Sequence, residues 1–91
     1  GLIHFVISGI EKVTSFFGSS AADEIIVRVA SFIKKYENPH NIFTGRTATN
    51  EFTVLMTETY DDGCRKLATK IYGGLQEQEV KALCRLFPAG A

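Results

Sequence analysis

The chain has 91 residues, 45% of them hydrophobic, and its 10 lysines and arginines balance 10 aspartates and glutamates. This composition predicts one globular domain over residues 1–91 with a single core. Zero net charge disfavours partners bound mainly by charge, such as duplex DNA or an anionic membrane. No apolar run approaches the roughly 20 residues of a membrane span, and no signal peptide is visible. Because the chain begins at Gly1 and its only methionine is Met56, we expect a domain cut from a longer protein.

The first part of the chain predicts a strand and a short helix. Residues 2–8 are dense in β-branched and aromatic side chains, with no polar alternation except His4, which indicates a central strand or one covered on both faces. Residues 10–17 predict a helix that Gly18 stops, because glycine adopts positive φ without strain. The apolar residues expected on one face of this helix are Ile10, Val13 and Phe17.

The clearest helix of the sequence is predicted to begin at Ser20. Ser20 and Asp23 resemble a capping box, in which two side chains satisfy the free N–H groups of the first turn. The cations Lys34 and Lys35 suit a C-terminal turn, and residues 38–39 (Asn-Pro) end the helix. The apolar stripe expected to be buried consists of Ile26, Val29, Ala30 and Ile33, widened by Ile25 and Phe32.

A β-hairpin follows this helix. Residues 42–46 predict the incoming strand, and residues 52–57 alternate with period two, as a strand with one buried face does. The expected inward-facing residues are Phe52, Val54 and Met56, opposed by Thr53, Leu55 and Thr57. The small polar residues 47–50 form the predicted tip. A tip held by two core strands is a good place for function, although this one carries almost nothing reactive.

The remaining residues predict a third helix and a last strand. Thr59 and Asp62 repeat the capping pattern, and residues 73–74 (Gly-Gly) are expected to fray or close the helix. Its apolar stripe is Cys64, Leu67, Ala68, Ile71 and Leu75. A polar connector over 76–79 leads to a strand over 80–87. The order β-α-α-β-β-α-β predicts an α+β, ferredoxin-like sandwich with helices on one face of an antiparallel sheet.

Few side chains outside the hairpin suggest chemistry. Cys64 and Cys84 match no zinc pattern and are too few for a disulfide framework. A bridge between them is conceivable, but we interpret them as buried thiols packed as small apolar residues. His4 has no visible partner in its apolar strand, and His40 is interpreted as a solvated loop residue.

Two segments, 46–52 and 17–26, share their order and spacing with a known family. Residues 46–52 read Arg-Thr-Ala-Thr-Asn-Glu-Phe, similar to Arg-x-Gly-Gly-Asp/Glu-Glu-Phe. Residues 17–26 read Phe-Gly-Ser-Ser-Ala-Ala-Asp-Glu-Ile-Ile, similar to aromatic-Gly-His-x-x-Gly-Asp-x-x-Leu. These patterns resemble the signatures of GGDEF domains, the diguanylate cyclase family. The spacing between the segments needs no gap, and the resemblance covers nearly the whole chain.

The departures from the family pattern fall on its catalytic positions. The resemblance implies two carboxylates that hold a divalent cation on GTP, but the chain has Val6 and Asn50 there. Valine cannot coordinate a metal, and a neutral amide replaces an acid poorly. Ala48 and Thr49 stand where the family has its two glycines, so side chains would crowd the ligand. The resemblance therefore implies a degenerate cyclase without catalytic residues, metal or cofactor.

The nucleotide-binding positions are also altered. Thr14 stands at the family's guanine-reading asparagine, while its partner aspartate is kept as Asp23. These two could be a vestigial nucleotide site, although we interpret Asp23 first as a helix-terminus acid. Glu11 replaces a lysine near the phosphates. The inhibitory Arg-x-x-Asp site would fall at Pro39 and Ile42 and is absent.

Two other signature residues have structural interpretations. Glu51 is expected to pair with Arg46 or Lys12 in a salt bridge at the hairpin base. Phe52 is expected in the core. Neither interpretation needs chemistry at the hairpin tip.

These observations favour an inactive GGDEF-like regulatory module in a bacterial, cytoplasmic cyclic di-GMP signalling protein. The resemblance implies a neighbouring EAL or sensor domain as partner and admits a homodimer, without nucleic acid or direct membrane contact. The alternatives are a ferredoxin-like small-molecule or protein-binding module unrelated to cyclic di-GMP, and a GTP-sensing domain. An RNA-recognition fold is disfavoured by the neutral charge. An active cyclase with relocated ligands ranks last.

Overall fold

The computed structural model describes residues 1–57 and 61–87. The elements are β1 (Leu2–Ile7), α1 (Ile10–Phe17), α2 (Ser19–Lys34), β2 (Ile42–Ala48), β3 (Glu51–Met56), α3 (Asp61–Glu77) and β4 (Ala82–Phe87). This order confirms the predicted β-α-α-β-β-α-β succession and the α+β class.

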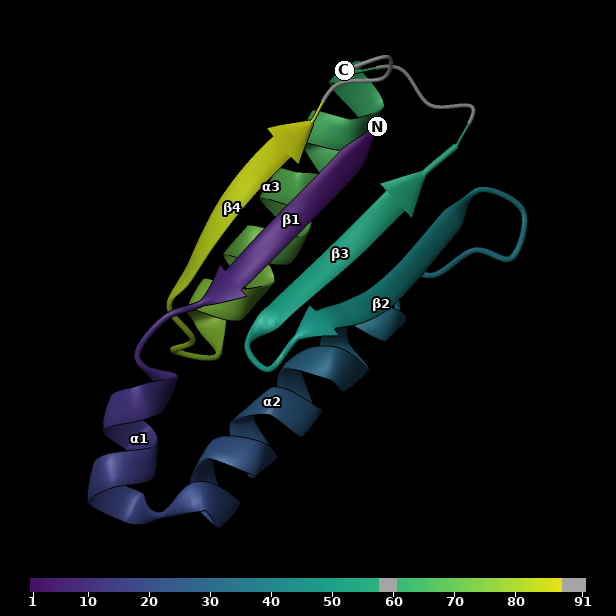
Figure 1. Cartoon of the computed structure of the whole chain (residues 1–91). Helices are drawn as coiled ribbons and strands as arrows, with labels where there is room; N and C mark the ends of the chain where they lie inside the picture. Colours follow the sequence, from purple (N-terminus) through teal and green to yellow (C-terminus); the bar gives the residue numbers. More distant parts are fainter. Residues whose placement is uncertain (58–60, 88–91) are drawn as a thin grey trace.

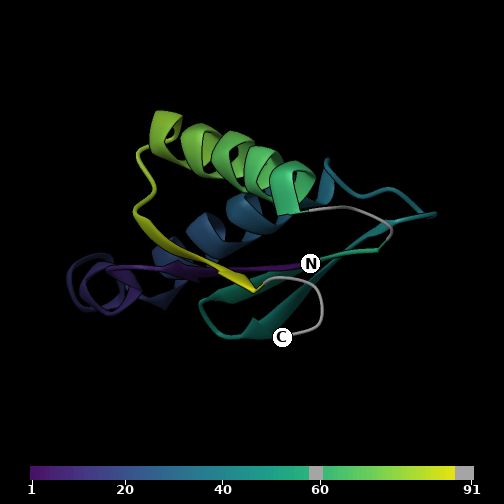
Figure 2. The same cartoon turned by 90° about the horizontal axis from the view of Figure 1, so that it is seen from above.

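The strands form an antiparallel sheet in the order β2-β3-β1-β4, so β1 is central, which was one of the two predicted alternatives. Helices α2 and α3 cover one face of the sheet (Figure 1), and the view from above shows both on the same side (Figure 2). Helix α1 lies beyond the end of the sheet. No described helix covers the opposite face, which we call the open face. The residues on this face include Leu2, His4, Val6, Phe43, Gly45, Thr47, Glu51, Thr53, Leu55, Leu83, Arg85 and Phe87.

The core lies between the sheet and the two covering helices. The strands contribute Ile3, Phe5, Ile7, Phe52, Val54 and Met56, all buried, so the predicted alternation in the second hairpin strand is confirmed. From α2 come Ala22, Ile26, Val29 and Ile33. Ala30 is half-buried, and the stripe begins one turn earlier than predicted, at Ala22. From α3 come Cys64, Ala68, Ile71 and Leu75, with Leu67 half-buried.

The predicted capping box at Ser20 is wrong. Helix α2 already begins at Ser19, with Gly18 as its N-cap and no capping side-chain hydrogen bond. Gly18 adopts φ +93°, a conformation that strains other residues, and it also ends α1. One glycine therefore joins the two helices directly, and Ser20 falls inside the first turn. The predicted cap at Thr59 lies outside the described residues.

The prediction that residues 73–74 close the third helix is also wrong, because α3 continues to Glu77. The end is formed by backbone hydrogen bonds: the N–H of Val80 donates to the carbonyl of Leu75 at 2.9 Å, and that of Glu79 to Gln76 at 3.0 Å. Glu79 adopts φ +61°. These are the features of a Schellman motif, which closes a helix without needing glycine inside it. The last strand accordingly begins at Ala82 rather than at residue 80.

The two glycines inside α3 predict opposite effects of the same substitution. A Cβ added at Gly74 would overlap the ring of Phe32, with Cε2 at 2.9 Å, whereas one added at Gly73 meets nothing within 4 Å. Gly73→Ala is therefore expected to raise the free energy of unfolding by about 0.5–1 kcal/mol, through helix propensity. Gly74→Ala is expected to lower it by about 1–3 kcal/mol, through overpacking. Urea denaturation of both variants measures this, and equal effects would contradict the packing of α3 on α2.

Candidate functional site

The candidate site is a groove lined by the end of β1, the start of α1 and the tip of the hairpin. These segments lie at the end of the sheet nearest α1 (Figure 1). Its volume is about 570 Å³. The lining residues are Val6, Ile7, Ser8, Gly9, Ile10, Glu11, Lys12, Thr49 and Asn50. Residues far apart in sequence thus form one cleft.

Asn50 fastens the hairpin tip to the end of β1. Its side-chain amide nitrogen donates to the carbonyl of Ile7 at 3.1 Å, and its own backbone carbonyl accepts from the N–H of Ile7 at 2.8 Å. The tip is shorter than predicted: β2 runs to Ala48 and β3 begins at Glu51, with a register shift between Arg46 and Ala48. Asn50 therefore acts as part of the sheet's hydrogen-bond pattern.

Arg46 closes the turn. Its Nη2 donates to the carbonyl of Thr49 at 2.6 Å, and its Nε lies 3.2 Å from the carbonyl oxygens of Ala48 and Thr49. A guanidinium with donors in a fixed fork suits such converging carbonyls. The arginine is thus engaged by backbone at the tip.

The expected pairing of Glu51 with Arg46 or Lys12 is corrected by the structure. Oε2 of Glu51 lies 3.3 Å from Nε2 of His4, and both side chains are partly buried. The register explains this contact: His4 stands opposite Thr53, so Glu51 is its diagonal neighbour on the open face. His4 therefore does have a partner. Phe52 is buried in the core, as predicted.

The groove does not offer the donor set of a divalent cation site. Such cations prefer several oxygen ligands, charged ones above all. Among the lining residues only Glu11 carries a carboxylate, and Asn50 offers a neutral amide oxygen in place of a charged one. In the described part of the chain, no group of three or more His, Cys, Asp or Glu side chains could hold a metal.

The predicted vestigial nucleotide residues lie apart from this groove. The hydroxyl of Thr14 donates to the carbonyl of Ile10, one turn back on α1, at 3.0 Å. Asp23 is exposed on α2, and neither side chain lines the groove. Of the residues singled out from the sequence, the structure places Val6, Thr49, Asn50 and Glu11 in the lining of this groove.

Gly9 and Ile10 were not assigned to the site from the sequence. Gly9 takes φ +79° as the N-cap of α1, and no side chain caps that helix end. The junction of a strand, a glycine and a helix was the available signal for a groove at this point.

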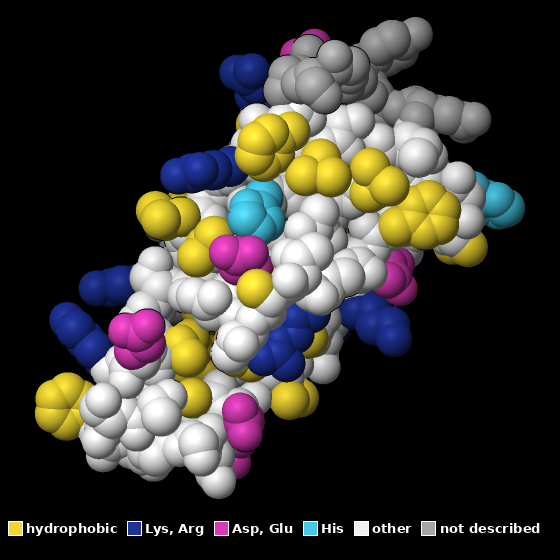
Figure 3. Space-filling view, viewed as in Figure 1, with side chains coloured by type: hydrophobic (Ala, Val, Ile, Leu, Met, Phe, Trp, Pro, Cys, Tyr) yellow, Lys and Arg dark blue, Asp and Glu magenta, His cyan; other side chains and the backbone are white. Residues whose placement is uncertain are grey.

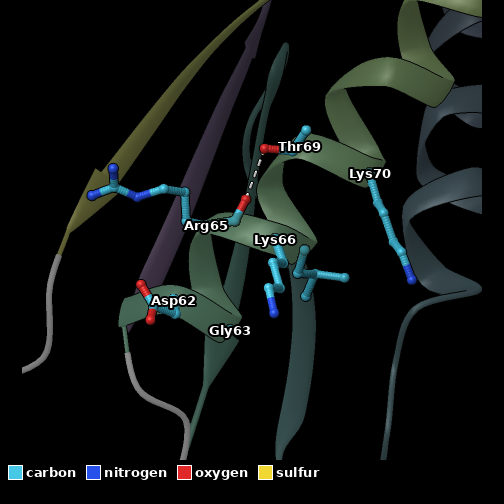
Figure 4. Close-up of a pocket in the computed structure, with 7 residues that line it drawn as sticks. Asp62, Gly63, Arg65, Lys66, Thr69 and Lys70 are labelled. Atoms are coloured by element: carbon cyan, nitrogen blue, oxygen red, sulfur yellow. Dashed lines mark hydrogen bonds between the residues drawn. The ribbon is translucent and has the colours of Figure 1, made fainter.

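A second groove, of about 650 Å³, runs along the first half of α3 (Figure 4). It is lined by Asp62, Gly63, Arg65, Lys66, Leu67, Thr69 and Lys70. Figure 4 shows Arg65 and Lys70 extending to opposite sides of the helix, while the hydroxyl of Thr69 donates to the carbonyl of Arg65 at 2.9 Å. Arg65 and Lys70 therefore do not converge on one anion.

Cys64 is buried, as predicted, whereas Cys84 is only half-buried. Burial raises the pKa of Cys84, and the electrostatic effect of Cys64 raises it further. A raised pKa disfavours the reactive thiolate. This agrees with the interpretation of both residues as packing groups.

Comparison with known proteins gives matches only among solved structures. No family model and no curated protein matches the chain. LapD from Vibrio cholerae, a structure with an S helix, GGDEF and EAL bound to c-di-GMP, is 17% identical, with a TM-score of 0.78 over 91% of this chain and 21% of that one. The active GGEEF domain of a diguanylate cyclase from V. cholerae is 22% identical, with a TM-score of 0.74 over 91% and 56%. SiaD from Pseudomonas aeruginosa, in complex with its activator SiaC, is 16% identical, with a TM-score of 0.74 over 81% and 28%.

The chain has the fold of a GGDEF domain. Within this GGDEF fold, the segment 46–52 forms the hairpin between β2 and β3. The chain spans 21%, 56% and 28% of the lengths of these three structures, so it corresponds to part of each. In the described residues, no helix is both long and apolar enough to cross a membrane.

Proposed function

We propose that this chain is a catalytically inactive GGDEF-like domain that serves as a regulatory module in bacterial cyclic di-GMP signalling. The observation that carries the proposal is Asn50, whose amide nitrogen is bound to the Ile7 carbonyl in the groove it shares with Val6. At the two positions where the resemblance implies metal carboxylates, one side chain is apolar and the other serves the hairpin.

The rest of the groove supports inactivity. Phosphoryl-transfer sites depend on cations that neutralise the phosphates and align the reacting oxygens. The lining side chains supply one cation, Lys12, and it is offset by its neighbour Glu11. Thr49 also carries a side chain where the family pattern has a glycine. Binding and activation of a triphosphate therefore lack the groups that the reaction needs.

As a regulatory module, the domain would act through neighbours. LapD combines its GGDEF domain with an EAL domain, and SiaD binds an activator protein. By analogy, we infer a cytoplasmic module that contacts an EAL or sensor domain of the same protein, or a second copy of itself. We infer no nucleic acid partner, because the net charge is zero.

The proposal predicts no cyclic di-GMP synthesis. Incubation with GTP and Mg²⁺ or Mn²⁺, at enzyme concentrations that would detect slow turnover, is expected to yield no product by chromatography. An active diguanylate cyclase assayed in parallel is the control for the assay. Product that forms with this chain and is lost in Asn50→Ala would contradict the proposal and assign the groove to catalysis.

A further inference from the structure

Strand β2 forms one edge of the sheet (Figure 1), and the hydrogen bonds around it fix which of its residues point outward. Met56, which stands opposite Ile42, exchanges backbone hydrogen bonds with Gly1 on its other side, at 2.8 and 2.9 Å. Ile42 therefore directs its own N–H and carbonyl away from β3. Asn38 binds both of these groups, at 2.9 and 3.0 Å, and so closes the edge at this point.

The next part of this edge is open. Backbone direction alternates along an antiparallel strand, so Phe43 and Gly45 bond toward β3, whereas Thr44 and Arg46 point outward. Among the described residues, no group hydrogen-bonds to the outward N–H and carbonyl groups of Thr44 and Arg46. Beyond Arg46 the register shifts, which bends the strand. Unpaired N–H and carbonyl groups in a row are a template for a further strand.

We propose that two copies of this chain pair their β2 strands antiparallel, edge to edge, about a two-fold axis at Gly45. This register places Thr44 opposite the partner's Arg46, so that every free backbone group named above gains a partner. At the axis Gly45 meets the partner's Gly45, and no side chain obstructs the close approach of the two backbones. Strand pairing lies in the plane of the sheet, so it leaves both faces of the sheet to other parts of a longer protein.

Charge complementarity supports this register. The hydroxyl of Thr44 donates to Oε1 of the exposed Glu37 at 2.6 Å. Residues directly opposite each other share a face, with Cβ atoms about 4.5–5.5 Å apart, so the partner's Arg46 comes within reach of Glu37. Among the described residues, Arg46 uses Nε and Nη2 at its own hairpin tip, which leaves Nη1 to donate to the partner's Glu37.

The symmetry repeats this contact in the opposite direction, as in other isologous dimers. Figure 3 shows acidic and basic side chains close together at the margin of the molecule where Figure 1 places β2. Each copy therefore presents both signs of charge at the same edge. A strand of another protein would need the same spacing of an acid and an arginine, which a second copy supplies by symmetry.

The first test follows amide hydrogen exchange, residue by residue, at low and high protein concentration. Exchange of the Thr44 and Arg46 amides should slow by about tenfold or more as the dimer forms, because these N–H groups become hydrogen-bonded. The amides of Phe43 and Gly45 are the internal control, since they already point toward β3 and should exchange slowly at both concentrations. Sedimentation analysis of the same samples measures the fraction of dimer. A chain that stays monomeric, or one that associates without protecting Thr44 and Arg46, would overturn the proposal.

The second test exchanges the charges. Glu37→Arg and Arg46→Glu should each weaken the homodimer by about tenfold or more, because like charges then face each other. An equimolar mixture should form heterodimers, since both cross-chain pairs are again of opposite charge. Glu24→Arg, at an exposed position of α2, is the matched control and should associate like the unchanged chain.

Circular dichroism checks that the charge variants fold. If the mixture associated no better than either variant alone, the pairing of Glu37 with the partner's Arg46 would be wrong and the two-fold register would fall. Neither test depends on nucleotide chemistry, so the dimer and the proposed function can fail separately.

Discussion

Replacing Ile33 by alanine is expected to lower the free energy of unfolding by about 2–5 kcal/mol. Ile33 is 1% exposed and lies on α2 in the core between helices and sheet. The substitution removes buried methyl and methylene groups and leaves a cavity, because the sheet beneath relaxes only in part. Urea denaturation followed by circular dichroism measures the change.

Val27→Ala on the same helix is the control. Val27 is 64% exposed, so its truncation removes little buried surface. We expect a change within about 0.5 kcal/mol, as for other surface substitutions. If Ile33→Ala cost no more than Val27→Ala, the helical layer would not pack on the sheet as described.

The fold was predictable because its main patterns are local and periodic. Period-two alternation in Phe52, Val54 and Met56 and the helical stripe through Ile26, Val29 and Ile33 both identify the core face directly. Hydrophobic burial dominates folding, so these patterns are reliable. The order of the predicted strands and helices then indicated an antiparallel sheet with helices on one face.

The element ends were not predictable to the same degree, since backbone geometry decides them. The sequence near Ser20 suggested a capping box, but Gly18 at φ +93° starts α2 immediately after α1. The glycine pair in α3 suggested an end, yet Gly74 gives room to the ring of Phe32. The C-terminal end of α3 depends on Glu79, which adopts φ +61°. Positive φ is uncommon for glutamate, so the sequence gives no signal for it.

The candidate site was predictable only in part. The resemblance placed Val6 and Asn50 at related positions, and the structure shows both in one groove. The partner of Glu51 could not be assigned, because the contact with His4 depends on a strand register between residues 47 positions apart. Likewise, the outward-pointing backbone groups of Thr44 and Arg46 are identified only once the pairing of β2 with β3 is known.

GTP in the presence of Mg²⁺ is expected to bind no more tightly than the millimolar range, about −4 kcal/mol. The exposed Asp23 and the hydroxyl of Thr14 could offer one or two hydrogen bonds to a guanine edge, each worth about 0.5–1.5 kcal/mol net. The Thr14 hydroxyl already donates to Ile10, so it is left as an acceptor. This gain is too small to hold a triphosphate without a metal.

The phosphates of GTP make the binding free energy less favourable. Glu11 lines the groove and repels an anion, and Lys12 alone cannot neutralise a triphosphate. Titration calorimetry with GTP and Mg²⁺ measures the affinity, with Asp23→Ala as the test variant and Glu24→Ala, which removes the neighbouring exposed acid, as its control. Micromolar binding that disappears in Asp23→Ala and persists in Glu24→Ala would contradict the expectation. The domain would then be a sensor of GTP, because a guanine pocket would have survived the loss of the metal site.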